Sequence, residues 1–83
     1  MDQEIIYEIR RLARPLNADT FVSQLEYMKE HGSSVTLNWG EGDDLWECSW
    51  ITAGNRFSGY SGGMRMSVVR CLENVLKGIE AED

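Results

Sequence analysis

The sequence predicts an α+β domain in which helices cover one face of a three-stranded antiparallel meander, in the order α-α-β-β-β-α. Apolar residues recur at helical spacing near both ends of the chain, whereas between residues 35 and 60 they alternate with polar residues. Two glycine-containing turn signals divide this alternating stretch into three strands. A meander with one apolar face needs helices to cover that face, so the 83 residues predict a single two-layer domain, 1–83.

An N-terminal helix is expected over residues 3–14, within an N-terminal segment 1–16. Acidic residues lie at its start and arginines at its end, where each complements the helix dipole. Pro15 disfavours helical backbone at Arg14 and is therefore expected to end the helix. The apolar stripe of this helix consists of Ile5, Ile6, Ile9, Leu12, Ala13 and Leu16.

A second helix, expected over residues 19–31, opens the core segment 17–79. Asn17 or Asp19 is the expected N-cap, and Gly32 is suited to the left-handed conformation that often ends a helix. The expected buried face of this helix consists of Phe21, Val22, Leu25 and Met28.

Three strands are expected, at residues 34–39, 45–53 and 56–60. A glycine- and acid-rich turn at residues 40–44 joins the first two strands. Because side chains two residues apart share a face, placing Trp39 opposite Trp46 gathers three apolar pairs on one face. These pairs are Trp39 with Trp46, Leu37 with Cys48, and Val35 with Trp50.

The second hairpin is expected to close at Gly54-Asn55, a dipeptide typical of two-residue loops. This closure places Phe57 opposite Thr52 and Gly59 opposite Trp50, so that the glycine leaves room for an indole ring. The opposite face of the sheet is then mostly polar and open to water. It carries Thr36, Asn38, Glu47, Ser49, Ile51, Arg56, Ser58 and Tyr60.

A last helix is expected over residues 65–79, after the strand is broken at Ser61-Gly62-Gly63. Its wide apolar stripe consists of Val68, Val69, Cys71, Leu72, Val75, Leu76 and Ile79. Residues 80–83 form an acidic tail that is expected to fray, because acids oppose the dipole at a helix C-terminus.

Composition excludes several classes of protein. No apolar run approaches the ~20 residues that a membrane span needs. Residues 1–8 lack a basic region, so no signal peptide is expected, and Cys48 and Cys71 are expected to be reduced thiols in a cytoplasm. With His31 as the one histidine, the chain offers too few ligands for a structural zinc site, and no metal or cofactor is expected.

The sequence predicts a protein that is not an enzyme, and it predicts no catalytic residue. General acid–base catalysis needs a poised pair of groups in a cleft. Here the acids lie on turns and at the termini, and His31 lies at the end of a helix.

Four acids, Glu41, Asp43, Asp44 and Glu47, cluster around the first hairpin. They can form a solvated turn, or they can mimic phosphates and compete for a basic groove on a partner; the spacing of an EF-hand is absent. Trp39 and Trp46 flank this turn and belong either to the core or to a partner-binding anchor. Trp50 is expected in the core, and Tyr60 is a second candidate anchor, on the open face.

The order of elements over residues 20–79 resembles that of the double-stranded-RNA-binding domain. In that family a glycine-rich joint precedes the last helix, as Gly59-Tyr60-Ser61-Gly62-Gly63 does here, and a basic cluster at the helix start grips phosphates. The corresponding stretch here, Met64-Arg65-Met66-Ser67, carries one base. The resemblance implies nucleic-acid binding, for which the candidate contacts are Arg10, Arg14, Arg65 and Arg70.

In size and acidity the chain also resembles the small inhibitors that phages deploy against bacterial immunity or host enzymes, such as anti-CRISPR and anti-restriction proteins. Its 14 acids and 8 bases give a net charge of −6 and a pI near 4.6. This charge repels a polyanion, so the sequence favours a protein-interaction module that inhibits or regulates a larger, basic protein partner. The alternatives are double-stranded nucleic-acid binding and a homo-oligomeric accessory protein such as a homodimer.

Overall fold

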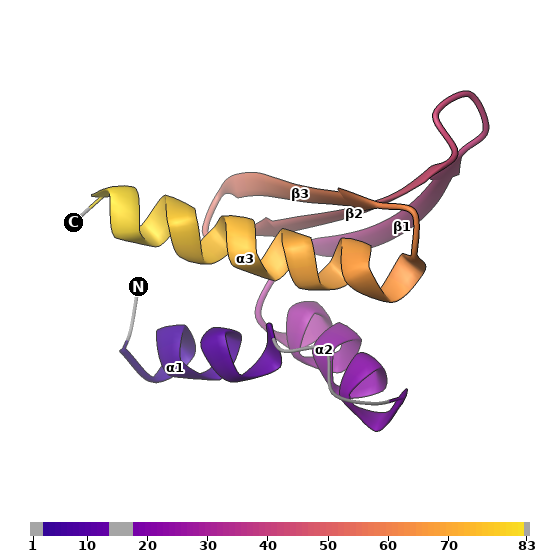
Figure 1. Cartoon of the computed structure of the whole chain (residues 1–83). Helices are drawn as coiled ribbons and strands as arrows, with labels where there is room; N and C mark the ends of the chain where they lie inside the picture. Colours follow the sequence, from indigo (N-terminus) through magenta and orange to yellow (C-terminus); the bar gives the residue numbers. More distant parts are fainter. Residues whose placement is uncertain (1–2, 14–17, 83) are drawn as a thin grey trace.

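The computed structural model describes residues 3–13 and 18–82, with the side chains of residues 3–13 and 21–78. It confirms the predicted order α-α-β-β-β-α (Figure 1). The elements are α1 (Gln3–Leu12), α2 (Ala18–Glu30), β1 (Ser34–Gly40), β2 (Leu45–Thr52), β3 (Asn55–Ser61) and α3 (Met64–Glu82).

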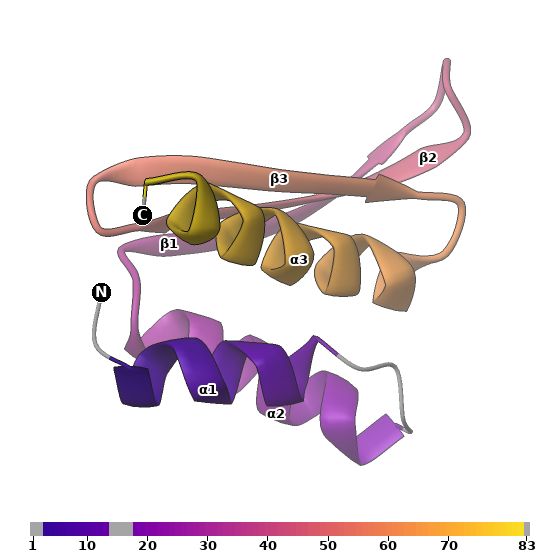
Figure 2. The ribbon, with the colours of Figure 1, turned by 60° about the vertical axis from the view of Figure 1, so that its left-hand side comes forward.

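The three strands form an antiparallel sheet in the order β1-β2-β3, and all three helices lie on one side of it (Figures 1 and 2). Helix α3 packs against β3 and β2, while α2 contacts β1. Helix α1 packs against α3 and α2. The other face of the sheet is left open, as the alternation of apolar and polar residues predicts.

The register of the first hairpin is the predicted one. Trp39 lies opposite Trp46, Leu37 opposite Cys48, and Val35 opposite Trp50. Residues 41–44 form the connecting loop, whose last residue, Asp44, adopts a φ of 53°. Aspartate is among the few residues that tolerate this left-handed conformation.

The predicted register of the second hairpin is wrong by two positions. Its loop is Ala53-Gly54, with φ values of 53° and 77°, the positive pair that a type I′ turn requires. Thr52 therefore pairs with Asn55, and Phe57 lies opposite Trp50. Moving a two-residue loop by one position shifts the pairing by two and leaves every side chain on its face. The alternation pattern therefore cannot separate the two registers.

Two glycines, Gly59 and Gly32, allow close packing. The prediction that Gly59 makes room for the indole of Trp50 is wrong. A Cβ atom on Gly59 would overlap the backbone of α3, at the nitrogen of Cys71 and the oxygen of Ser67, so Gly59 makes room for a helix and not for an indole. The residue that makes room for the Trp50 indole is Gly32, after the end of α2.

The core lies between the sheet and the helices. Its buried residues are Ile9, Leu12, Met28, Cys48, Trp50, Val68, Cys71, Leu72 and Val75, all of them on predicted inward faces. In α2 one expectation was wrong, because Val22 is 54% exposed whereas Gln24 is buried and donates a hydrogen bond to the carbonyl of Leu12. Gln24 lies four residues before Met28, so it occupies the stripe despite its polarity.

The ends of the helices differ from the predicted ones. Helix α2 begins at Ala18, so Asp19 lies inside the helix, and Asn17 falls outside the described residues together with Arg14, Pro15 and Leu16. Helix α3 continues to Glu82, through most of the segment expected to fray. Its final residues include glutamate and alanine, which have high helix propensity.

Candidate functional site

The hairpin formed by β1 and β2 extends beyond the helical layer (Figures 1 and 2). The acidic residues of its loop, Glu41, Asp43 and Asp44, are all exposed. The loop is closed by a backbone hydrogen bond of 2.9 Å from the nitrogen of Asp44 to the oxygen of Gly40. We call these three acids the acidic tip. They concentrate negative charge at the far end of the protruding hairpin.

An aromatic pair lies at the base of the acidic tip. The rings of Trp39 and Trp46 are 5.4 Å apart between centroids and tilted by 56°. They share the sheet face that Trp50 occupies, and Trp50 is fully buried, but Trp39 is 45% exposed and Trp46 is half-buried. The apolar face of the sheet thus continues from the core into solvent, because the hairpin extends beyond the ends of the helices that cover this face elsewhere.

Glu47 belongs to a different surface from the acidic tip. It lies on the open face of the sheet, where the hydroxyl of Tyr60 donates a 2.6 Å hydrogen bond to its carboxylate. This hydrogen bond, followed by the negative charge of Glu47, raises the pKa of Tyr60 above its ordinary value. Tyr60 is 51% exposed and so lies on the open face as predicted, on the strand next to Glu47.

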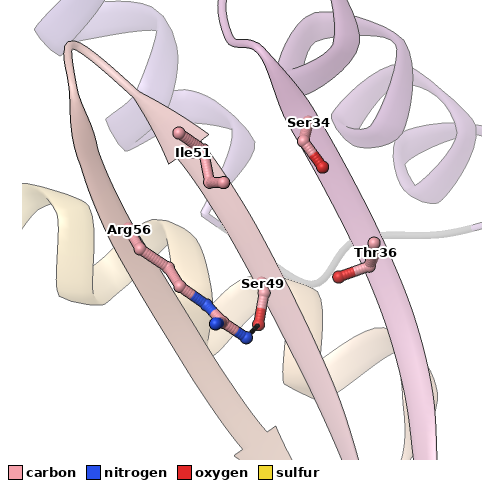
Figure 3. Close-up of a pocket in the computed structure, with 5 residues that line it drawn as sticks. All are labelled: Ser34, Thr36, Ser49, Ile51 and Arg56. Carbon is pink, nitrogen blue, oxygen red and sulfur yellow. Dashed lines mark hydrogen bonds between the residues drawn. The ribbon is translucent and has the colours of Figure 1, made fainter.

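Sequence reasoning missed a hollow of about 220 Å³ on the open face (Figure 3). The guanidinium of Arg56 donates a 3.2 Å hydrogen bond to the hydroxyl of Ser49, which also lies 3.2 Å from the hydroxyl of Ser58. The hollow offers hydroxyl groups and one cation to a small polar ligand. Its lining consists of Ser34, Thr36, Ser49, Ile51 and Arg56, residues whose shared face was readable from the alternation pattern.

The arginines proposed to hold nucleic acid are not gathered into one free surface in the described part of the chain. The guanidinium of Arg65 lies over the ring of Phe21, 5.7 Å from its centroid. Arg70 donates a 2.9 Å hydrogen bond to the carbonyl of Tyr60. Arg10 is exposed on α1, and Arg14 lies outside the described residues.

The cysteines and the histidine, whose side chains could in principle react or bind a metal, make contacts within the fold. Cys48 and Cys71 are both free and fully buried, and interaction with the Cys48 thiol, followed by burial, raises the pKa of Cys71. The ring of His31 stacks on Tyr27, and its Nδ1 lies 3.0 Å from the Tyr27 carbonyl oxygen. Among the described residues, no three histidine, cysteine or acidic side chains gather in a way that could hold a metal ion.

Within residues 3–13 and 18–82, no helix has both the length and the apolar character to cross a membrane. Comparison with known proteins adds no relative: the chain matches no family model, and neither its sequence nor its fold has a significant match among curated proteins or solved structures.

Proposed function

We propose that this protein is a non-enzymatic interaction module that binds a larger, basic protein through the hairpin of β1 and β2. One observation carries the proposal: a charged tip and an exposed tryptophan occur together on a hairpin that extends past the rest of the molecule. The net charge of −6 has the same sign as this tip and adds to its field.

The two parts of the hairpin supply different contributions to binding. The carboxylates of Glu41, Asp43 and Asp44 steer a basic surface toward the tip and accelerate encounter, an effect that weakens as salt is added. Trp39 supplies the apolar contact that slows dissociation, since partly exposed tryptophans are frequent binding hot spots. Trp46 supports its ring, and Tyr60 is the anchor of an alternative site on the open face.

Inhibition or regulation is the proposed consequence of this binding. An acidic hairpin that occupies a basic groove excludes the anionic ligand for which that groove is built. Small size and acidity support an accessory protein of the kind that phages and mobile elements encode. The free thiols of Cys48 and Cys71 support a reducing compartment such as the cytoplasm.

The second candidate function is double-stranded nucleic-acid binding, which the α-β-β-β-α order supports. Arg65 and Arg70 already make contacts within the chain, and the net charge opposes a polyanion. A mobility-shift assay with duplex RNA and duplex DNA at about 50 mM salt separates the candidates, because phosphate contacts are strongest at low salt. Saturable binding there would favour this second candidate over the first.

The experiment that tests the first candidate is capture of partners from a host lysate with the wild type and two charge-matched variants. Glu41→Lys with Asp43→Lys reverses the tip, and Asp44 is retained because a lysine is strained at its positive φ. Glu26→Lys with Glu73→Lys makes the same change in net charge at exposed sites on the helices.

The tip variant is expected to lose the partner that the wild type and the helix variant both retain. With the purified partner, its association rate should fall about tenfold at low salt, because steering by the tip is removed. Equal capture by the two variants would mean that the hairpin is not the recognition surface.

A further inference from the structure

The two edges of the sheet are treated differently by the rest of the molecule. Along β3, side chains of α3 reach around the edge and occupy backbone carbonyls that face outward. Asn74 donates a 2.6 Å hydrogen bond to the carbonyl of Ser58, and Arg70 donates a 2.9 Å bond to that of Tyr60. Two outward carbonyls of this edge are therefore already occupied, which disfavours the addition of another strand.

The orientation of these carbonyls fixes the orientation of the backbone across the whole sheet. The backbone N–H and C=O groups of Ser58 and Tyr60 point away from β2. The backbone groups of their partners on β2, Ser49 and Glu47, therefore point away from β3 and toward β1. Ile51 lies two residues after Ser49, so its backbone groups should also point toward β1. A 2.8 Å hydrogen bond from the nitrogen of Ser33, just before β1, to the oxygen of Ile51 agrees with this orientation.

On β1 the outward-facing backbone groups therefore belong to Val35, Leu37 and Trp39. The hydrogen bonds between β1 and β2 use the backbone groups of the alternate residues of β1, Thr36 and Asn38, which pair with Ser49 and Glu47. Among the described residues, no side chain or loop donates to, or accepts from, the outward groups of these three residues.

Strand β1 also lacks the features by which proteins usually protect an exposed edge. Its seven residues include no charge and no proline, and its pairing with β2 runs without a bulge. The acidic tip begins where this strand ends, and Trp39 lies one residue before that end. The edge thus combines free backbone groups, an exposed indole and a negatively charged end.

We propose that the free edge of β1 accepts an extended segment of the partner as a fourth strand, with lysine or arginine side chains where that segment passes the acidic tip. In such strand addition, backbone hydrogen bonds give affinity and alternate side chains give specificity. In this proposal the alternate apolar side chains of the partner segment pack beside Trp39, and its basic side chains form ion pairs with Glu41 and Asp43. This inference rests on the proposed function and specifies the conformation and charge of the bound segment.

Charge selects this occupant over a second copy of the chain. Two copies that each carry −6 repel one another. A second β1 strand would also bring no lysine or arginine to the acidic tip, because Ser34–Gly40 contains none.

The test uses ¹⁵N-labelled protein and a synthetic peptide in which alternating valine and threonine residues are followed by three lysines. Two control peptides replace the lysines with glutamates or place a proline in the middle of the alternating stretch. With the lysine peptide, we expect saturable shifts of the amides of Val35, Leu37 and Trp39. The glutamate peptide should bind at least about tenfold more weakly at low salt, and the proline peptide should lose the edge shifts.

Two protein variants with equal charge locate the site. Asn38→Lys places a lysine on the edge strand, and Ile51→Lys places one on the central strand, with both side chains on the open face. Asn38→Lys should weaken binding of the lysine peptide about tenfold or more, since a lysine on an edge opposes strand addition. Ile51→Lys should retain it.

The possible failures are distinguishable. Shifts confined to residues 41–44 would overturn strand addition and leave the acidic tip as a docking site for a basic partner. Edge shifts that persist unchanged in the Glu41→Lys, Asp43→Lys variant would overturn the basic character of the segment and the proposed function with it. Edge shifts that depend on protein concentration without peptide would identify a second copy as the occupant and overturn the proposal.

Discussion

The indole Nε1 of Trp50 donates a 2.7 Å hydrogen bond to the carbonyl oxygen of Met28, and both residues are fully buried. The carbonyls of the last helical turn lack partners within their own helix. Trp50 satisfies one of them from the middle strand, so a single side chain fills the core and fixes the end of α2 against the sheet. Gly32 permits this arrangement by leaving the space that the indole occupies.

Trp50→Phe is predicted to destabilise the protein by about 2–4 kcal/mol, because it leaves a buried carbonyl without a donor and removes part of the core. Trp50→Ala should cost about 3–5 kcal/mol, a large fraction of the stability of a small domain. Trp39→Phe, at an exposed indole, is the matched control and should cost less than about 1 kcal/mol. Urea unfolding measures all three, and equal losses at both tryptophans would contradict the packing described here.

Gly59→Ala is predicted to be strongly destabilising, because the added methyl group meets the α3 backbone, which cannot move aside as a flexible side chain can. We expect a loss of about 3 kcal/mol or failure to fold. Gly42→Ala is the control, since nothing lies within 4 Å of the added atom. Thermal unfolding that shows the same midpoint for both variants would rule out the close contact between β3 and α3.

The two thiols are predicted to react slowly with iodoacetamide in the folded protein and at the normal rate once guanidinium unfolds it. Burial denies access, and the raised pKa of Cys71 keeps its thiol protonated. Alkylation followed by mass spectrometry measures both rates. Rapid labelling of the folded protein would show that α3 separates readily from the sheet.

The raised pKa of Cys71 also predicts how stability changes with pH. Below the unfolded pKa of about 8.5, both states hold the proton and the full stability is present. Above that value the unfolded chain releases the proton while the folded protein retains it, so stability falls as pH rises. Urea midpoints of the wild type should therefore decline above about pH 8.5 more steeply than those of the Cys48→Ala, Cys71→Ala variant, which removes both members of the thiol pair. Equal declines would contradict a raised pKa within the pair.

Glu47→Gln is predicted to lower the pKa of Tyr60 toward its ordinary value, because it removes the carboxylate that accepts the phenolic hydrogen bond. The ¹³Cζ shift of Tyr60, followed by NMR through alkaline pH, reports this change. Glu73→Gln on α3 is the control and should leave the titration of Tyr60 unchanged. An unaltered titration in Glu47→Gln would mean that the pair is open in solution.

The predictions that the sequence made well concern periodic patterns. Alternation around the 40–44 turn determined which residues of β1 and β2 face the helices, and the loop itself fixed the pairing of Trp39 with Trp46. Helical spacing likewise identified Met28, Val68 and Leu72 as core residues. Burial of apolar side chains repeats with the period of the element, so the order of residues carries that information directly.

Tertiary structure decided the features that a periodic pattern leaves open. The second hairpin closes at Ala53-Gly54 because that register sets Trp50 against Phe57, while alternation accepts either loop. Gln24 is buried because a carbonyl of α1 needs its amide, a contact between elements that no spacing reveals. The exposure of Trp39 and the free edge of β1 depend on how far the helices extend over the sheet and on which edge α3 covers. These are distances between elements remote in sequence, and only the packed chain sets them.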